Sequence, residues 1–207
     1  MPLRAVVFDF GGVLFDWNPD YLYRKLIPDA AERRWFLEHV CNPAWNLQQD
    51  GGRPFSEANA ALIAEHPQHE AHIRAFSERW PETLNGTLAD GVALMEALEA
   101  AGVPLYGLTN WSAETFPYAW QHYPLLQRFR DIVVSGRLKL IKPDPAIYAE
   151  MHACIKRDLP DVETAELAFI DDSQKNADAA TALGWHGIHH TSAAHTAEQL
   201  RRLGLVF

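Results

Sequence analysis

The sequence predicts an α/β fold, in which a doubly wound parallel sheet has a helical segment inserted after its first strand. Three observations support this fold. Short apolar runs recur along the chain, helical patterns alternate with them in the C-terminal two thirds, and residues 17–85 hold helical patterns without a convincing strand. With 207 residues, the chain is long enough for one domain that carries an inserted subdomain.

The predicted strands are short and almost continuously apolar. Runs that do not alternate between polar and apolar residues are typical of strands that helices cover on both faces. The runs are residues 4–8, 103–108, 131–136, 166–170 and 186–190.

Predicted helices lie between these runs. Residues 89–102 place apolar residues at helical spacing and end in a glycine, and residues 175–184 also end in a glycine, which is a common helix stop. Residues 196–207 predict a terminal helix followed by an apolar tail. This alternation of strand and helix, with short connections, implies a parallel sheet.

Residues 17–85 have aromatic and leucine residues at helical spacing. We expect them to form a helical cap, and residues 1–16 and 86–207 to form the α/β core. An insertion after the first strand lies above the carboxyl ends of the strands, where ligands bind in open α/β folds. The segment is therefore a candidate lid. We expect most of its tryptophans to pack in its own small core, with one facing the site.

Composition narrows the classes of partner and location. The net charge is −9 and lysine and arginine occur in clusters no longer than a pair, so we expect neither nucleic acid nor an anionic membrane as a partner. No apolar run approaches the ~18 residues that span a bilayer. The two cysteines and the absence of a signal-peptide pattern predict a cytoplasmic protein. Oligomeric state stays open.

Polar residues stand at the ends of predicted strands or just beyond them. Because the carboxyl ends of parallel strands lie on one edge of a sheet, we expect these residues to converge on one crevice. They are Asp9, Thr109 with Asn110, Lys142, and Asp171 with Asp172.

Asp9, Asp171 and Asp172 predict a cluster of carboxylates. Two such charges ~4 Å apart repel by about 4 kcal/mol at an effective dielectric constant of about 20, so the cluster needs a cation. Oxygen ligands with room for water suit Mg²⁺. Lys142 and the Thr109 hydroxyl could then hold a phosphoryl group, with Asp9 free to attack it.

These residues form four motifs: "VVFDFGGVL" with Asp9, "LYGLTN" with Thr109, "LIKPDPAIY" with Lys142, and "AFIDDSQKNADAA" with Asp171, Asp172 and Asn176. Their order and spacing resemble those of the haloacid dehalogenase-like (HAD) hydrolase superfamily, whose core is Rossmann-like. The chain looks most similar to members with a small helical cap between the first two motifs. These include sugar-phosphate phosphatases, the phosphatase domain of epoxide hydrolases, and 2-haloacid dehalogenases.

The resemblance implies a phosphatase that acts on a small phosphorylated metabolite, such as a sugar phosphate. Asp9 would be the nucleophile that forms an aspartyl-phosphate. The resemblance further implies that Mg²⁺ is bound by Asp9, Asp171 and the backbone carbonyl of Gly11, with Asp172 supporting it through water. Thr109 and Asn110 would hold the phosphoryl oxygens, and Lys142 would steady the nucleophile and the phosphate. Asn176 stands at the distance from the paired acids of the fourth motif that is usual in the family.

Gly11 departs from the family pattern. Most phosphatases of the superfamily have a second aspartate there, which protonates the leaving group and then activates water. Glycine cannot transfer a proton, and such help is typically worth about 10²–10⁴-fold in rate. The sequence offers two replacements, Asp16 or a cap histidine (His39, His66 or His69). For Asp16 the sequence favours a capping or hinge carboxylate beside Trp17 and Pro19 over a proton donor.

Two alternatives remain open. A 2-haloacid dehalogenase uses the same fold and an aspartate nucleophile without a metal. The pair Asp171-Asp172 argues against it, because unneutralised acids would repel an anionic haloacid, whereas Gly11 argues weakly for it. The third possibility is a HAD-like binding protein with impaired catalysis.

Overall fold

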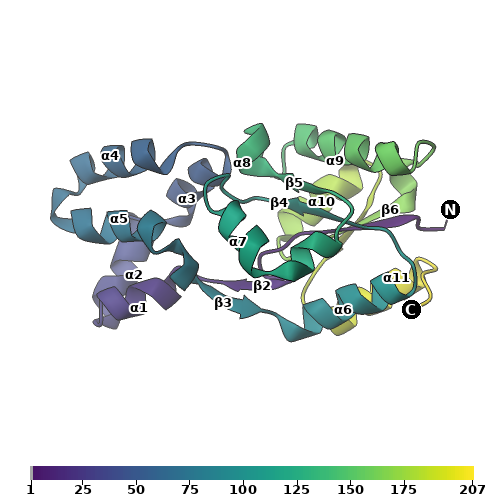
Figure 1. The fold of residues 1–207 in the computed structure, drawn as a ribbon, viewed down its shortest axis with the longest axis horizontal. Helices are drawn as coiled ribbons and strands as arrows, with labels where there is room; N and C mark the ends of the chain where they lie inside the picture. Colours follow the sequence, from purple (N-terminus) through teal and green to yellow (C-terminus); the bar gives the residue numbers. More distant parts are fainter. Residues whose placement is uncertain (1) are drawn as a thin grey trace.

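The central sheet of the computed structural model, which describes residues 2–207, has five parallel strands in the order β5-β4-β1-β6-β7 (Figure 1). The predicted strands are confirmed with slightly different bounds. They are β1 (Ala5–Phe8), β4 (Leu105–Thr109), β5 (Ile132–Val134), β6 (Leu167–Asp171) and β7 (His186–His189).

The strand order reverses direction at β1. Strands β4 and β5 lie on one side of it, and β6 and β7 lie on the other. Phe8 at the end of β1 is in register with Gly107 of β4 and Ile170 of β6. Ligands bind outside the carboxyl ends of the strands at such a reversal. Asp9 directly follows β1 and Asp171 ends β6, so the two acids lie on the two sides of the expected crevice.

Helices cover both faces of the sheet, as the continuous apolar runs predict. On one face, Val6 and Phe8 share a core with α6 (Ala89–Ala100) and α11 (Ala193–Arg202). On the other, Ala5 and Val7 belong to a second core with α9 (Pro145–Asp158), against which α10 (Gln174–Ala182) also packs. Alternate residues of β1 therefore enter opposite cores. Among residues 2–207, no helix is long and apolar enough to cross a bilayer.

Five helices gather at one end of the molecule, away from the sheet (Figure 1). Tyr23 packs on Phe36 with ring centroids 4.8 Å apart, and Trp45 packs on Phe76 at 5.1 Å, so these helices have an aromatic core of their own. The helices are α1 (Asp20–Leu26), α2 (Ala30–His39), α3 (Pro43–Asp50), α4 (Phe55–Glu65) and α5 (Glu70–Glu78). Shorter elements are α7 (Phe116–His122), α8 (Ser135–Leu138) and the 3₁₀ turns η1 (Pro67–His69), η2 (Trp80–Thr83), η3 (Pro124–Arg128) and η4 (Thr164–Glu166).

The expectation that residues 17–85 lack a strand is wrong at both ends of the segment. Strands β2 (Phe15–Trp17) and β3 (Leu84–Thr87) pair antiparallel and form a ribbon between the five helices and the sheet. The sequence does not reveal these strands, because β2 has only three residues and β3 is half polar, so neither shows a periodic pattern. They pair because the chain returns to β2 after the five helices. The expected boundaries at residues 17 and 85 fall inside this ribbon and stay a prediction.

We predict that Gly91→Ala destabilises the fold. A Cβ at Gly91 on α6 would lie 1.9 Å from the backbone oxygen of Val13, in the segment that follows Asp9. Overpacking of this kind costs about 1–3 kcal/mol or more, and each kcal/mol lowers the melting temperature by about 2–4 °C in a chain of this size. Ala93→Ser on the exposed face of the same helix is the control. Equal melting temperatures for both variants and the wild type would contradict the close approach.

Candidate active site

A buried lysine joins the ends of two strands. The Nζ of Lys142 lies 2.8 Å from Oδ1 of Asp9, just after β1, and 2.7 Å from Oδ2 of Asp171, at the end of β6. It also donates to the backbone oxygen of Leu108 at 2.9 Å. All three charged side chains are buried. The structure thus brings together residues that are far apart in the sequence.

Two amides fix the lysine and one of its partners. The side chain of Asn110 accepts from the backbone N–H of Lys142 (2.8 Å) and donates to its carbonyl (3.1 Å). Asp171 accepts from Nδ2 of Asn176 at 3.0 Å and from the backbone N–H of Ser173 at 2.8 Å. Asn110 therefore positions Lys142, and its expected contact with phosphoryl oxygens stays a prediction.

The electrostatics of the cluster favour an additional cation. Burial raises the pKa of Asp9 to about 7; Lys142 opposes this increase, and the charge of Asp171 adds to it. Burial also lowers the pKa of Lys142, but Asp9 and Asp171 outweigh it, so the pKa of Lys142 is raised and its ammonium stays charged. One ammonium thus faces the carboxylates of Asp9, Asp171 and Asp172.

The donor set fits Mg²⁺. The carboxylate oxygens of Asp9, Asp171 and Asp172 lie within 4.8 Å of one another, and they are the hard oxygen ligands that Mg²⁺ prefers. Gly12 has a φ of +66°, and a Cβ there would lie 2.4 Å from Oδ2 of Asp172. The second glycine of the pair therefore lets the chain turn past Asp172. At Gly11, by contrast, a Cβ would meet no atom within 4 Å.

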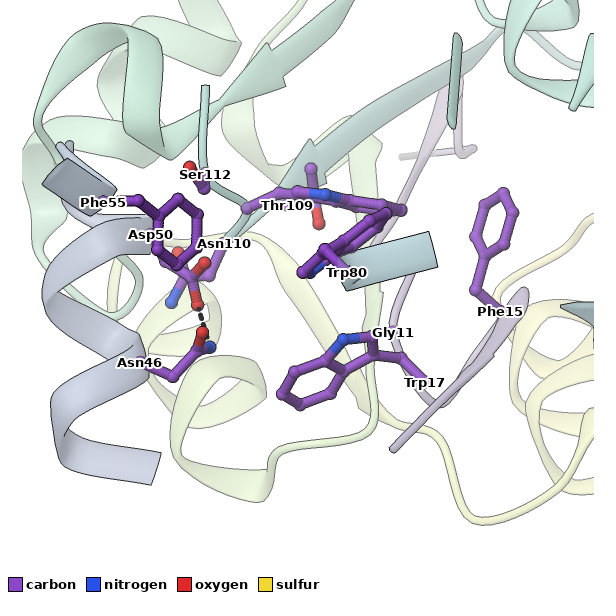
Figure 2. A pocket seen from close by; sticks show the side chains of 11 residues that line it. Gly11, Phe15, Trp17, Asn46, Asp50, Phe55, Trp80, Thr109, Asn110 and Ser112 are labelled. Carbon is purple, nitrogen blue, oxygen red and sulfur yellow. Dashed lines mark hydrogen bonds between the residues drawn. The ribbon is translucent and has the colours of Figure 1, made fainter. Parts of the chain in front are cut away.

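A pocket lies beside Gly11 and the carboxyl end of β4 (Figure 2). Its walls come from the core, the ribbon and the helical segment together. The lining residues are Gly11, Phe15, Trp17, Asn46, Asp50, Phe55, Trp80, Thr109, Asn110, Trp111 and Ser112. Two of the tryptophans of residues 17–85, Trp17 and Trp80, line the pocket, where we expected one. The sequence had no signal for Asp50, because an aspartate before two glycines is typical of a turn.

Asp16 and the three histidines, which the sequence offered as replacements for the acid missing at Gly11, do not line this pocket. Asp16 accepts from the hydroxyl of Tyr21 (2.8 Å) and from Nδ2 of Asn85 (2.9 Å), across the β2-β3 ribbon. His39 and His66 line a different hollow, and His69 packs against Phe36. None of these side chains lines the pocket that residues 2–207 form beside Asp9.

A family model for "haloacid dehalogenase-like hydrolase" matches residues 3–184, which include Asp9, Lys142 and Asp171. The chain belongs to the haloacid dehalogenase-like hydrolases. It is therefore a hydrolytic enzyme, and its α/β core with a parallel sheet is the one expected of this family.

Relatives of this HAD hydrolase include named phosphatases. The sesquiterpene phosphatase astK of Aspergillus oryzae is 28% identical over 201 residues, which cover 97% of this chain and 96% of that protein. A phosphoglycolate phosphatase of Nitrosospira multiformis is 26% identical, over 90% of this chain and 82% of its own length. A HAD family enzyme from Bacteroides thetaiotaomicron, solved with magnesium and inorganic phosphate, has a TM-score of 0.61 at 19% identity, over 88% of this chain and 91% of that one.

We predict that Lys142→Met strongly destabilises the protein without added metal. The substitution leaves the buried Asp9 and Asp171 without their ammonium, and breaking a buried ion pair in this way costs about 3–5 kcal/mol. Thermal unfolding measures the loss. Lys156→Met, on the exposed side of α9, should change the melting temperature little. A Lys142→Met protein as stable as the wild type would refute the structural role of this ion pair.

Proposed function

We propose that this HAD hydrolase is a Mg²⁺-dependent phosphomonoesterase that acts through an aspartyl-phosphate on Asp9. The main observation is the placement of the Asp9 carboxylate, which is held 2.8 Å from Lys142, inside an acidic cluster and beside a pocket. The phosphatase names of both relatives support the reaction class. The substrate would be a small phosphorylated molecule, and a sugar phosphate is the example that the sequence suggested.

Asp9, Asp171, Asp172 and the backbone carbonyl of Gly11 would hold the Mg²⁺. When bound, the ion would offset the charge of the acidic cluster and of the phosphoryl oxygens. The magnesium and phosphate in the Bacteroides HAD enzyme, which has the same fold, support this proposal.

In the first step, a carboxylate oxygen of Asp9 attacks phosphorus, and the bond from phosphorus to the leaving oxygen breaks. The ammonium of Lys142 offsets negative charge on the transferred group, and the Thr109 hydroxyl donates to one of its oxygens. In the second step, water attacks the phosphorus of the aspartyl-phosphate, which releases phosphate and restores Asp9. Asn110 and Asn176 keep Lys142 and Asp171 in place throughout.

Residues 17–85 would act as a cap over a core formed by residues 1–16 and 86–207. Because the pocket has walls from both parts, closing the cap would exclude water while the aspartyl-phosphate forms. Asp16, which joins Tyr21 and Asn85 across the ribbon, fits the role of a hinge residue.

We predict phosphatase activity that requires Mg²⁺ and Asp9. Asp9→Asn should lower kcat by at least about 10³-fold, because it removes the nucleophile but keeps the shape of the side chain. EDTA should abolish the activity and added Mg²⁺ should restore it. The activity is measured as the rate of phosphate release. Asp178→Asn, an exposed aspartate of α10, is the control.

Metal-dependent turnover that survives Asp9→Asn would overturn the mechanism. A 2-haloacid dehalogenase would instead release halide in EDTA. A binding protein would take up phosphate stoichiometrically, without turnover.

A further inference from the structure

Five of the eleven residues that line the pocket beside Asp9 are aromatic. It adjoins the reacting centre through Gly11, Thr109 and Asn110, so it lies where the leaving group of a phosphate ester would be held. Its other walls are formed largely by five aromatic side chains, from the core, the ribbon and the cap helices. They are Phe15, Trp17, Phe55, Trp80 and Trp111.

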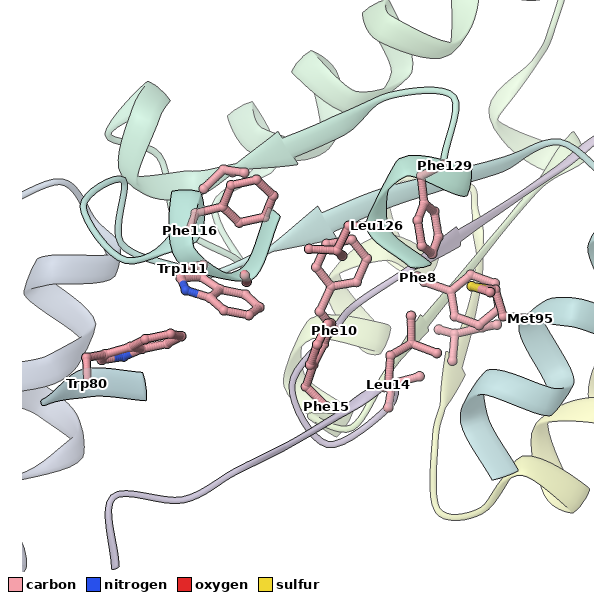
Figure 3. Close-up of a cluster of buried hydrophobic side chains, with 14 of the residues drawn as sticks. Phe8, Phe10, Leu14, Phe15, Trp80, Met95, Trp111, Phe116, Leu126 and Phe129 are labelled. Carbon is pink, nitrogen blue, oxygen red and sulfur yellow. The ribbon is translucent and has the colours of Figure 1, made fainter. Parts of the chain in front are cut away.

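These rings support one another. The Trp111 ring lies 5.7 Å from Phe15, edge to face, and 5.5 Å from Trp80 (Figure 3). The indole N–H of Trp111 is already used, because it donates to Oγ1 of Thr115 at 3.1 Å. The aromatic side chains that line the pocket are thus continuous with the buried aromatic core. The surface that they present to a ligand consists mainly of carbon atoms.

The polar side chains of the pocket do not suit a charged leaving group. Thr109, Asn110 and Ser112 lie at the end of β4 and just beyond it, while Asn46 and Asp50 lie on the cap side. No lysine, arginine or histidine is among the described lining residues. A carboxylate or second phosphate would therefore be desolvated without a cation to neutralise it, and a polyhydroxylated leaving group would lose water wherever it met the aromatic side chains.

We infer that this pocket selects an apolar alcohol, so that the substrate is the phosphate monoester of an aliphatic or aromatic alcohol rather than of a sugar or a hydroxy acid. The inference rests on the proposed phosphatase function and adds the chemical class of the leaving group.

Straight-chain alkyl phosphates test this inference, because lengthening the chain from ethyl to octyl adds apolar surface while the leaving-group chemistry hardly changes. In wild-type protein with Mg²⁺, kcat/KM should rise by up to about fourfold per methylene until the pocket is filled, which corresponds to about 0.8 kcal/mol per methylene. Octyl phosphate should exceed glucose 6-phosphate and 2-phosphoglycolate by at least about 10²-fold on the same scale.

Variants localise the effect. Trp80→Ala and Trp17→Ala should flatten the dependence on chain length, and Trp17 is the safer site because it is only partly buried. Trp35, a residue that is 43% exposed elsewhere on the cap helices, is the control, and Trp35→Ala should keep the full slope. A flat series in wild-type protein, or a preference for the polar esters, would overturn the inference while leaving a phosphatase. Lack of hydrolysis of every ester would instead refute the proposed function.

Asp50 supports a second inference, which also rests on the proposed phosphatase function. It is the only titratable side chain that lines the described pocket, and Nδ2 of Asn46 donates to its Oδ2 at 3.0 Å (Figure 2). No ion pair involving it is found among residues 2–207. Burial raises the pKa of the Asp50 carboxyl to about 8, so at neutral pH it is mostly protonated. The space at Gly11, where a side chain is missing, opens onto the same pocket.

We propose that Asp50 supplies the proton that Gly11 cannot. As the bond from phosphorus to the leaving oxygen breaks, that oxygen takes the Asp50 proton and leaves as the neutral alcohol. The Asp50 carboxylate then accepts a proton from the water that attacks the aspartyl-phosphate, which returns Asp50 to its protonated form.

Single-turnover kinetics with two leaving groups test this role. With Asp50→Asn, transfer of phosphate from butyl phosphate to Asp9 should slow by about 10²–10⁴-fold, since an alkoxide is a poor leaving group. Transfer from 2,4-dinitrophenyl phosphate should slow by less than about threefold, because this phenolate needs no proton. Asp178→Asn is the control. Equal losses for both esters, or this pattern in Asp16→Asn instead, would overturn the proposal.

Discussion

The site depends on one buried ammonium, that of Lys142, between the carboxylates of Asp9 and Asp171. These two acids stand at the carboxyl ends of the neighbouring strands β1 and β6, where the strand order reverses. The fold therefore places two negative charges close together. A surface ion pair would contribute little, but here neither carboxylate can turn to water. The amide of Asn110 supports this arrangement, because its two hydrogen bonds hold the Lys142 backbone beside the end of β4.

The Gly11-Gly12 pair has two different physical functions. Gly12 is required by shape, since its positive φ and the nearby Asp172 leave no room for a side chain. Gly11 is not, because a side chain there would enter open space. The absence of an acid at Gly11 is thus not forced by a lack of space, and in the proposed mechanism the cap wall of the pocket would supply the proton instead.

That wall belongs to the helical segment. Asp50 is the last residue of α3 and Asn46 lies one turn before it, Phe55 begins α4, and Trp80 begins η2. Asp50, Phe55 and Trp80 lie at element ends, so closure of the proposed cap would change their distances from Asp9. Core residues would thus provide the nucleophile and bind phosphate, while the segment would determine which alcohol fits and how it leaves.

The sequence by itself determined the parallel sheet, the helices that cover it and the identity of the acidic and lysine residues, because apolar periodicity and strand-end polarity are local signals. It also suggested that Asp9, Lys142 and Asp171 meet, since parallel strands end at one edge. Only the tertiary structure decided the β2-β3 pairing, the use of Asn110 on the Lys142 backbone, and the presence of Asp50 and Trp80 in the pocket. These depend on contacts between segments far apart in the chain, and neither an isolated aspartate nor a short half-polar strand has a pattern that reveals its partner.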